Sequence, residues 1–253
     1  MTINFTQLFQ DCWNFVRNQR QFVVSFMIIF VLVTGALSFV HFDSTVSVPE
    51  NITEEQAVEI MLQQAQSSTA QLAFVMQRVL SLFISAWGIM AIHHISLGNG
   101  LNLSVSATQT SRRFLGVMLL TFLCILPITL GLMGGMAALA QQQTPSILAL
   151  FLIIAGVFLF IRLCLAPISY LVGDTELKNT VQNMLKLGYH RSGALFLYCL
   201  IAYFLFPLII MQLTLLANNV VFFIIVLIGT AFINIFSLVF SYRFYTIFKQ
   251  KAY

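Results

Sequence analysis

Charged residues are scarce in this sequence. Asp, Glu, Lys and Arg together make up 8% of its 253 residues, whereas about 25% is usual in a soluble domain. Hydrophobic residues make up 59%. Because so few charges cannot cover a surface that faces water, we expect a membrane protein. The net charge of +4 comes from cations spread over several segments, without a basic stripe, so we expect no binding to nucleic acid.

The sequence also lacks the residue patterns of catalytic and metal sites. It has neither an HExxH nor a GxSxG motif, and none of its eight acidic residues falls in a long hydrophobic run. The cysteines form no CxxC pair; they are Cys12, Cys124, Cys164 and Cys199. The adjacent His93 and His94 would point about 100° apart on a helix, which makes them a poor metal pair. We therefore expect no catalytic residues, no metal, no cofactor and no enzymatic activity.

Long hydrophobic runs are abundant, and about 20 residues suffice to cross a bilayer as a helix. Six runs follow one another: Phe22–Phe42, Val79–Leu97, Phe114–Ala140, Ile147–Val172, Ala194–Ala217 and Val221–Phe244. The expected fold class is all-α, a polytopic membrane protein with about six transmembrane helices in one domain over residues 1–253. Gly131 and Gly135 have the GxxxG spacing that permits close helix packing; a glycine-lined permeation path is the alternative.

The segment before the first run, residues 1–20, is amphipathic. Its apolar side chains recur at helical spacing from Phe5 to Val16, and polar side chains occupy the opposite face. Trp13 suits the headgroup level of a bilayer. We expect an interfacial helix, with a helix exposed to water as the alternative.

The segment after the first run, residues 43–71, is acidic. It holds five acidic residues and no Lys or Arg. Thr53 and Gln56 have the spacing of a capping box, which predicts a helix that begins near Glu54 and continues into the second run. We interpret this segment as a solvated periplasmic loop and helix; a surface that attracts cations is the alternative.

The cations indicate the orientation of the chain. Ten Lys and Arg residues fall on one side of the six-helix map, and Arg78 alone falls on the other. The positive-inside rule then places both termini in the cytoplasm. The first, third and fifth runs each follow a polar segment containing Arg, which suggests three parallel units, each an elbow helix followed by a two-span hairpin. Shared interface chemistry without a true repeat is the alternative.

Arg162 lies inside the fourth run, where an ionised side chain costs about 2.5–3.5 kcal/mol on insertion scales. Pro167 lacks an amide donor, so the carbonyl of Leu163 loses its helical hydrogen bond. In one interpretation Arg162 is structural and donates to this carbonyl, or to polar groups such as Asn234 and Tyr203. In the other, Arg162 forms a ligand-binding site with Asn234 and Tyr203 for an anion such as a lipid phosphate, because no carboxylate in the spans pairs with it.

Two motifs carry a resemblance to a known family. The N-terminal pattern FxQLFxDxWNFVRNQ and the later RLCLAPISYLVGD, which an amphipathic helix follows, resemble the YciC-type family of uncharacterised inner-membrane proteins of Gram-negative bacteria. The element from Arg162 to Pro167 is also similar to the membrane domain attached to some glycerophosphodiester phosphodiesterases. The resemblance implies a multi-pass protein of the cell inner membrane.

Two kinds of non-enzymatic function fit these patterns best. The first is a membrane protein that handles or transports an anionic or lipidic ligand, with membrane lipid as its partner. The second is a structural or accessory subunit that binds other membrane proteins or a second copy of itself. A cavity that reaches Arg162 would favour the first, and a tightly packed Arg162 would favour the second.

Overall fold

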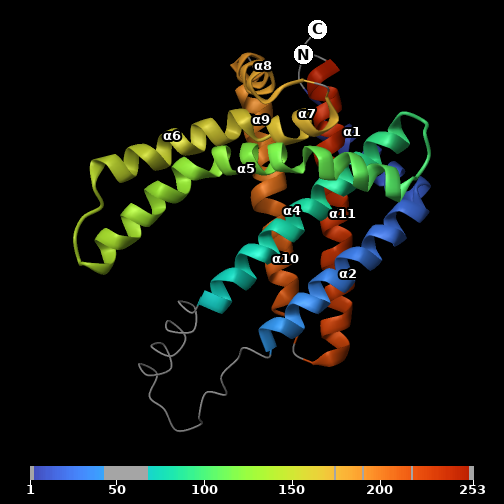
Figure 1. Ribbon diagram of the computed structural model, residues 1–253, viewed down its shortest axis with the longest axis horizontal. Coiled ribbons are helices and arrows are strands. Elements are labelled where there is room, and N and C mark those ends of the chain that lie inside the picture. The colour runs from blue at the N-terminus through green and yellow to red at the C-terminus, as the bar shows by residue number, and fades with distance from the viewer. Residues whose placement is uncertain (1–2, 43–67, 174, 190, 218, 251–253) are drawn as a thin grey trace.

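The structure is a computed structural model, and it describes residues 3–42, 68–173, 175–189, 191–217 and 219–250 (Figure 1). These ranges form helices and contain no strand, which confirms the all-α class. The helices are α1 (Phe5–Asn18), α2 (Arg20–Phe42), α4 (Ser68–Ser96), α5 (Leu103–Ala140), α6 (Ile147–Leu163), α7 (Ala166–Val172), α8 (Leu177–Tyr189), α9 (Ser192–Cys199), the π-helix η1 (Leu200–Leu205), α10 (Phe206–Thr214) and α11 (Val220–Gln250).

Among the described residues, five helices are long and apolar enough to cross a membrane, and α1 with α2 makes a sixth if this bent pair counts as one span. The structure thus supports the prediction of a polytopic membrane protein. The fourth and fifth spans are each interrupted, between α6 and α7 and at η1. Most of the acidic segment, residues 43–67, lies outside the described residues together with its predicted capping box.

The N-terminal helix α1 is amphipathic, as predicted. Asn4 caps it, since its side-chain oxygen accepts from the amide of Gln7 at 3.2 Å. The buried side chains of α1 are Leu8, Cys12, Phe15 and Val16. The helix then bends by 88° into α2.

Helix α1 packs lengthwise against α11. The ring of Phe5 lies 5.8 Å from that of Phe244, and Trp13 lies 6.4 Å from Phe232. Because residue numbers rise along α1 while their partners' numbers fall along α11, the two helices run antiparallel. The apolar face of α1 therefore contacts protein, and the placement of α1 at a membrane surface stays a prediction.

Helices α5 and α6 form a hairpin that projects away from the other helices (Figure 1). Residues 103–113, which precede the third hydrophobic run, form the first turns of α5. Two glycines let the two backbones approach: a Cβ on Gly131 would lie 2.9 Å from the carbonyl oxygen of Ala149, and one on Gly156 would lie 2.8 Å from the amide nitrogen of Ile128. Gly135 has nothing within 4 Å of such an atom, so one half of the predicted GxxxG pair makes the close contact and the other does not.

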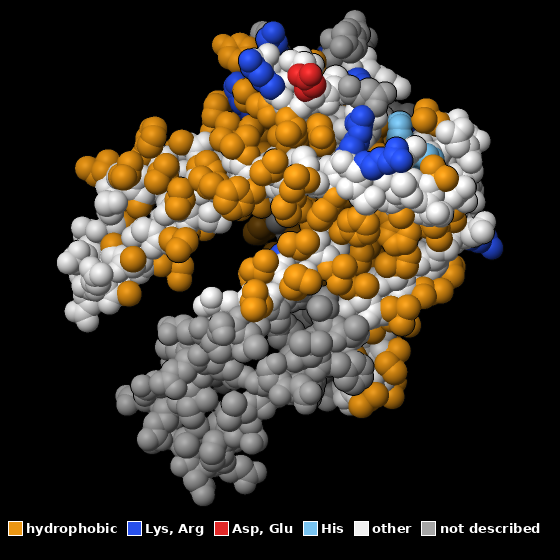
Figure 2. Space-filling model, viewed as in Figure 1, with side chains coloured by type: hydrophobic (Ala, Val, Ile, Leu, Met, Phe, Trp, Pro, Cys, Tyr) orange, Lys and Arg blue, Asp and Glu red, His pale blue; other side chains and the backbone are white. Residues whose placement is uncertain are grey.

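Lys and Arg side chains gather toward one end of the molecule, the upper part of Figure 2. They come from the bend between α1 and α2, the start of α5, helix α8 and the end of α11. Exposed apolar side chains cover the spans below them (Figure 2). Lys and Arg gathered at one end of apolar spans are typical of a membrane protein whose loops are basic on one side.

Candidate ligand-binding cavity

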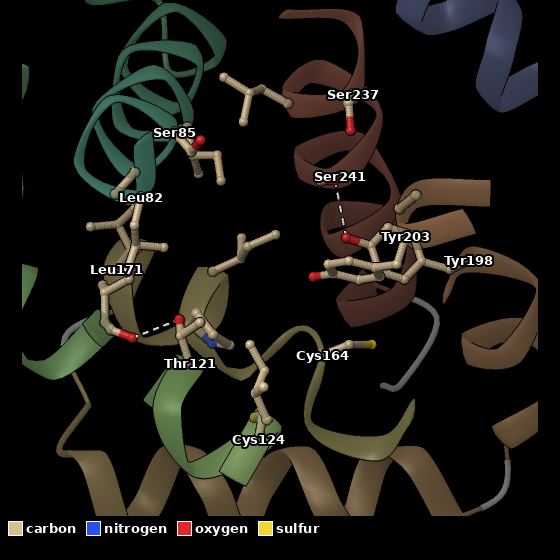
Figure 3. A pocket seen from close by; sticks show the side chains of 18 of the residues that line it. Leu82, Ser85, Thr121, Cys124, Cys164, Leu171, Tyr198, Tyr203, Ser237 and Ser241 are labelled. Atoms are coloured by element: carbon tan, nitrogen blue, oxygen red, sulfur yellow. Dashed lines mark hydrogen bonds between the residues drawn. The ribbon is translucent and has the colours of Figure 1, made fainter. Parts of the chain in front are cut away.

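A cavity of about 260 Å³ lies where α4, α5, α6, α7, α9, η1 and α11 meet (Figure 3). Its lining consists of Leu82, Ser85, Ala86, Ile89, Val117, Thr121, Cys124, Ile125, Phe160, Cys164, Pro167, Ile168, Leu171, Tyr198, Ala202, Tyr203, Ser237, Leu238 and Ser241. The cavity is partly open, and Tyr203 at its rim is 49% exposed. On this face the surface is hollowed between the α5–α6 hairpin and α4 (Figure 2).

The cavity wall is apolar with a few hydroxyl groups and no charged side chain. Ser85 donates to the carbonyl of Ser81 at 2.8 Å, and Thr121 donates to the carbonyl of Val117 at 2.9 Å. Since the hydroxyl hydrogens of Ser85 and Thr121 are used within their own helices, these two oxygens can only accept further bonds. A wall of this kind suits an uncharged, mainly apolar part of a ligand.

Two tyrosines close one side of the cavity (Figure 3). The hydroxyl of Tyr198 donates to Ser241 at 3.0 Å, and its ring stacks on Phe244 at 4.5 Å, so this side chain is fixed by α11. Tyr203 packs edge-on against Phe160 at 4.9 Å. Tyr203, a predicted site residue, therefore lies at the rim between η1 and α6.

The break between α6 and α7 contributes the floor of the cavity. Pro167 stands in the first turn of α7, and the carbonyl of Leu163 accepts a hydrogen bond from the thiol of Cys124, with 3.6 Å between sulfur and oxygen. A hydrogen bond from Arg162 to this carbonyl, expected in one interpretation, is not among those of the described residues. The thiol reaches it because Cys124 lies on the face of α5 that packs against the break, and the side chain of Arg162 leaves α6 in another direction.

Arg162 lies outside the cavity lining. Phe160, which lines the cavity, is two residues away, and two residues are about 200° of rotation on a helix. The guanidinium of Arg162 lies 4.4 Å from the ring centre of Phe158 and 5.3 Å from that of Tyr189. Its Nε is buried and has no hydrogen-bond partner among the described residues.

Asn234 is half-buried on α11 and is also absent from the cavity lining. It stands one helical turn before Leu238, which does line the cavity. The three predicted site residues are therefore not brought together: Tyr203 is at the rim, Asn234 is one turn beyond the wall, and Arg162 is on another face of α6.

Sequence reasoning missed the hydroxyl groups that line this cavity. A signal existed, because Ser81 and Ser85 on α4, and Ser237 and Ser241 on α11, repeat with a spacing of four residues on otherwise apolar helices. Such a repeat puts small polar groups on one face. The sequence alone could not show that these faces meet.

Comparison with known proteins finds a relative that matches along the whole chain. An uncharacterized protein of Haemophilus influenzae is 38% identical over 251 residues, which cover 99% of this chain and 100% of that protein. No family model matches the chain. No solved structure matches it either.

Proposed function

We propose that this protein is a non-enzymatic membrane protein that holds the acyl chain of a lipidic ligand in its central cavity. The protein belongs to the same family as the uncharacterized protein of Haemophilus influenzae. The observation that carries the proposal is the cavity itself. It lies within the apolar spans, opens on a hollowed apolar face, and has hydroxyl groups but no charge in its wall (Figure 2).

The size of the cavity limits what it can hold. A cavity of about 150 Å³ takes up benzene, and sites for drug-sized molecules measure about 300–1,000 Å³. At about 260 Å³, this cavity has room for part of a hydrocarbon chain but not for a whole phospholipid. The rest of such a ligand would extend out of the cavity through its opening.

The cationic face supports an anionic headgroup on the ligand. Arg113 lies one turn before Val117, a wall residue, and its guanidinium donates to the carbonyls of Tyr170 and Gly173 at the end of α7. This arrangement ends the cavity wall on α5 with a fixed positive charge. An amphiphile with its chain in the cavity would have its headgroup on that side.

The location and orientation belong to the same proposal. We place the protein in the cell inner membrane with both termini in the cytoplasm, supported by the ten-to-one distribution of cations. We also assign the relationship to the YciC-type proteins, and the more distant one to the membrane domain of some glycerophosphodiester phosphodiesterases, on the two sequence motifs alone.

The proposal is tested by filling the cavity. Ala202 lines it and is buried, so Ala202→Leu would place three further carbon atoms in the space for the ligand. Ala137 is exposed on α5, and Ala137→Leu makes the same chemical change toward lipid. Each protein is purified in mild detergent, and the bound lipid per protein is measured by mass spectrometry. We expect Ala202→Leu to lose bound lipid and Ala137→Leu to retain it.

Equal amounts of lipid on the parent and on folded Ala202→Leu would refute the proposal. In that case the alternative gains support, that of an accessory subunit that binds membrane proteins. The observation that supports this alternative is the projecting α5–α6 hairpin, whose exposed residues include Phe122, Met133 and Phe151. If substitution of these exposed residues removes proteins that co-purify with the parent, the accessory role is supported.

A further inference from the structure

A second, polar pocket of about 410 Å³ lies between α1 and α11, at the cationic end of the molecule. It is lined by Asp11, Asn14, Phe15, Asn18, Gln19 and Arg243. Ser241, which lines the central cavity, is two residues from Arg243 and therefore about 200° away around α11. The polar pocket thus faces away from the central cavity and is a separate site.

Arg243 is the one cation of this pocket. Its guanidinium lies 5.2 Å from the ring centre of Phe15, and its Nε is buried without a hydrogen-bond partner among the described residues. A charged donor that is withdrawn from water and left unpaired is unfavourable. Arg243 lines the pocket, so an anionic oxygen bound there would offset this cost by accepting from its guanidinium.

The rest of the lining balances that charge. Asp11 is the one acid of the pocket, and Asn14, Asn18 and Gln19 add three amides. Asp11 does not neutralise Arg243 through the Nε, which has no partner. The pocket thus presents one cation, one anion and neutral hydrogen-bonding groups. A ligand that carries both an anionic group and a protonated amine matches this set best.

An apolar groove of about 480 Å³ adjoins the polar pocket. Its lining is Phe9, Gln10, Trp13, Asn14 and Phe236, so Asn14 belongs to both. Trp13 is 55% exposed, and Trp is frequent at the interface between headgroups and hydrocarbon. A polar pocket that shares a wall residue with an apolar groove suits an amphiphile better than a small solute.

We propose that the α1–α11 groove binds a zwitterionic aminophospholipid of the phosphoethanolamine type. The phosphate accepts from Arg243, the ammonium group donates to Asp11, and an acyl chain lies along Phe9, Trp13 and Phe236. Phosphocholine lacks N–H donors for Asp11, and phosphoglycerol lacks the cation. This site is independent of the proposed function, because it involves another cavity.

Trp13 provides the test. In a Trp87→Phe background, Trp13 is the only tryptophan, so its quenching reports lipid in the groove. The protein is reconstituted into phosphatidylcholine bilayers containing increasing fractions of phosphatidylethanolamine, phosphatidylcholine or phosphatidylglycerol with brominated acyl chains. We expect half-maximal quenching at a fraction about two- to fivefold lower for phosphatidylethanolamine, the range that corresponds to a partly exposed ion pair.

Variants assign the preference to the pocket. Asp11→Asn and Arg243→Gln should remove it, and Arg243→Lys should retain part of it. Lys249→Gln removes the same charge from an exposed position on α11 outside the pocket, and it should leave the preference unchanged. If Arg243→Gln does not fold, Asp11→Asn and Arg243→Lys still decide the outcome.

Equal quenching by the three lipids would overturn the proposal. A preference that survives both Asp11→Asn and Arg243→Gln would overturn it as well. Binding of water-soluble phosphoethanolamine, without any preference among the lipids, would show a solute site and not a lipid site. Because the readout is at Trp13, none of these results depends on the lipid bound in the central cavity.

Discussion

Replacing Gly156 by alanine should loosen the α5–α6 hairpin. A Cβ at this position would lie 2.8 Å from the amide nitrogen of Ile128 and 3.1 Å from the carbonyl carbon of Pro127. Both are backbone atoms, which cannot rotate away as a side chain could. The helices must therefore separate by several tenths of an ångström, and overpacking of this kind costs about 1–3 kcal/mol.

The same substitution also favours the helix, because alanine is about 0.5–1 kcal/mol better than glycine in a helix interior. Gly135→Ala measures this second effect alone, since an added Cβ there meets nothing within 4 Å. Both glycines belong to the same hairpin, so the difference between the two variants isolates the steric cost.

We expect Gly156→Ala to be less stable than Gly135→Ala by about 1–3 kcal/mol. The measurement is the unfolding of each purified variant by SDS in mixed micelles, followed by circular dichroism. Gly135→Ala should equal or exceed the parent. If Gly156→Ala is as stable as Gly135→Ala, the backbones are not in contact at this point and the described hairpin packing is wrong.

Three further changes test other parts of the structure. Arg162→Gln should lower stability by about 1–2 kcal/mol, the value of a partly desolvated cation–π contact, and keep its bound anionic lipid; parent-like stability with loss of that lipid would instead make Arg162 an anion ligand. In single-cysteine proteins, Cys12, which is 0% exposed, should react with maleimide only after denaturation, whereas Gln10→Cys should react in the native state; equal rates would contradict the packing of α1. Reporter fusions at Glu55 and after Tyr253 should report opposite sides of the membrane, and a common side would refute the orientation.

The hydrophobic runs made some span ends predictable, although α4 and α5 begin 11 residues before the second and third runs. The third run was expected to end at Ala140, where α5 ends, and the fourth to begin at Ile147, where α6 begins. Ends of this kind are local, because a helix stops where polar residues replace apolar ones. The amphipathic helices α1 and α8 were predictable from the helical spacing of their apolar residues.

The site was less predictable, because Arg162 was selected for its charge inside a hydrophobic run, and it does not line the cavity. An arginine within a span is costly, but its direction depends on which neighbours cover it. In the structure two aromatic rings, Phe158 and Tyr189, lie beside it, and they come from different helices. No single sequence can show that Tyr189 reaches α6, so the sequence could indicate that Arg162 is unusual without indicating what it contacts.

The two prolines Pro167 and Pro207 explain better than Arg162 why a cavity forms. Pro167 lies at the start of α7, and Pro207 lies at the start of α10, directly after the π-helix η1. Each proline lacks the amide that would bond the carbonyl four residues earlier. The helix must break or widen at these points, so neighbouring side chains no longer follow the regular helical surface.

Both irregular turns face the same space. Cys164 and Pro167 from the first, and Ala202 and Tyr203 from the second, line the central cavity. Within a membrane, an irregular backbone is tolerated where protein buries it or where it borders a cavity. Two such turns, from spans that are separate in sequence, prevent regular side-chain packing between the helices. The two spans therefore do not pack closely at these turns, and the cavity lies between the turns.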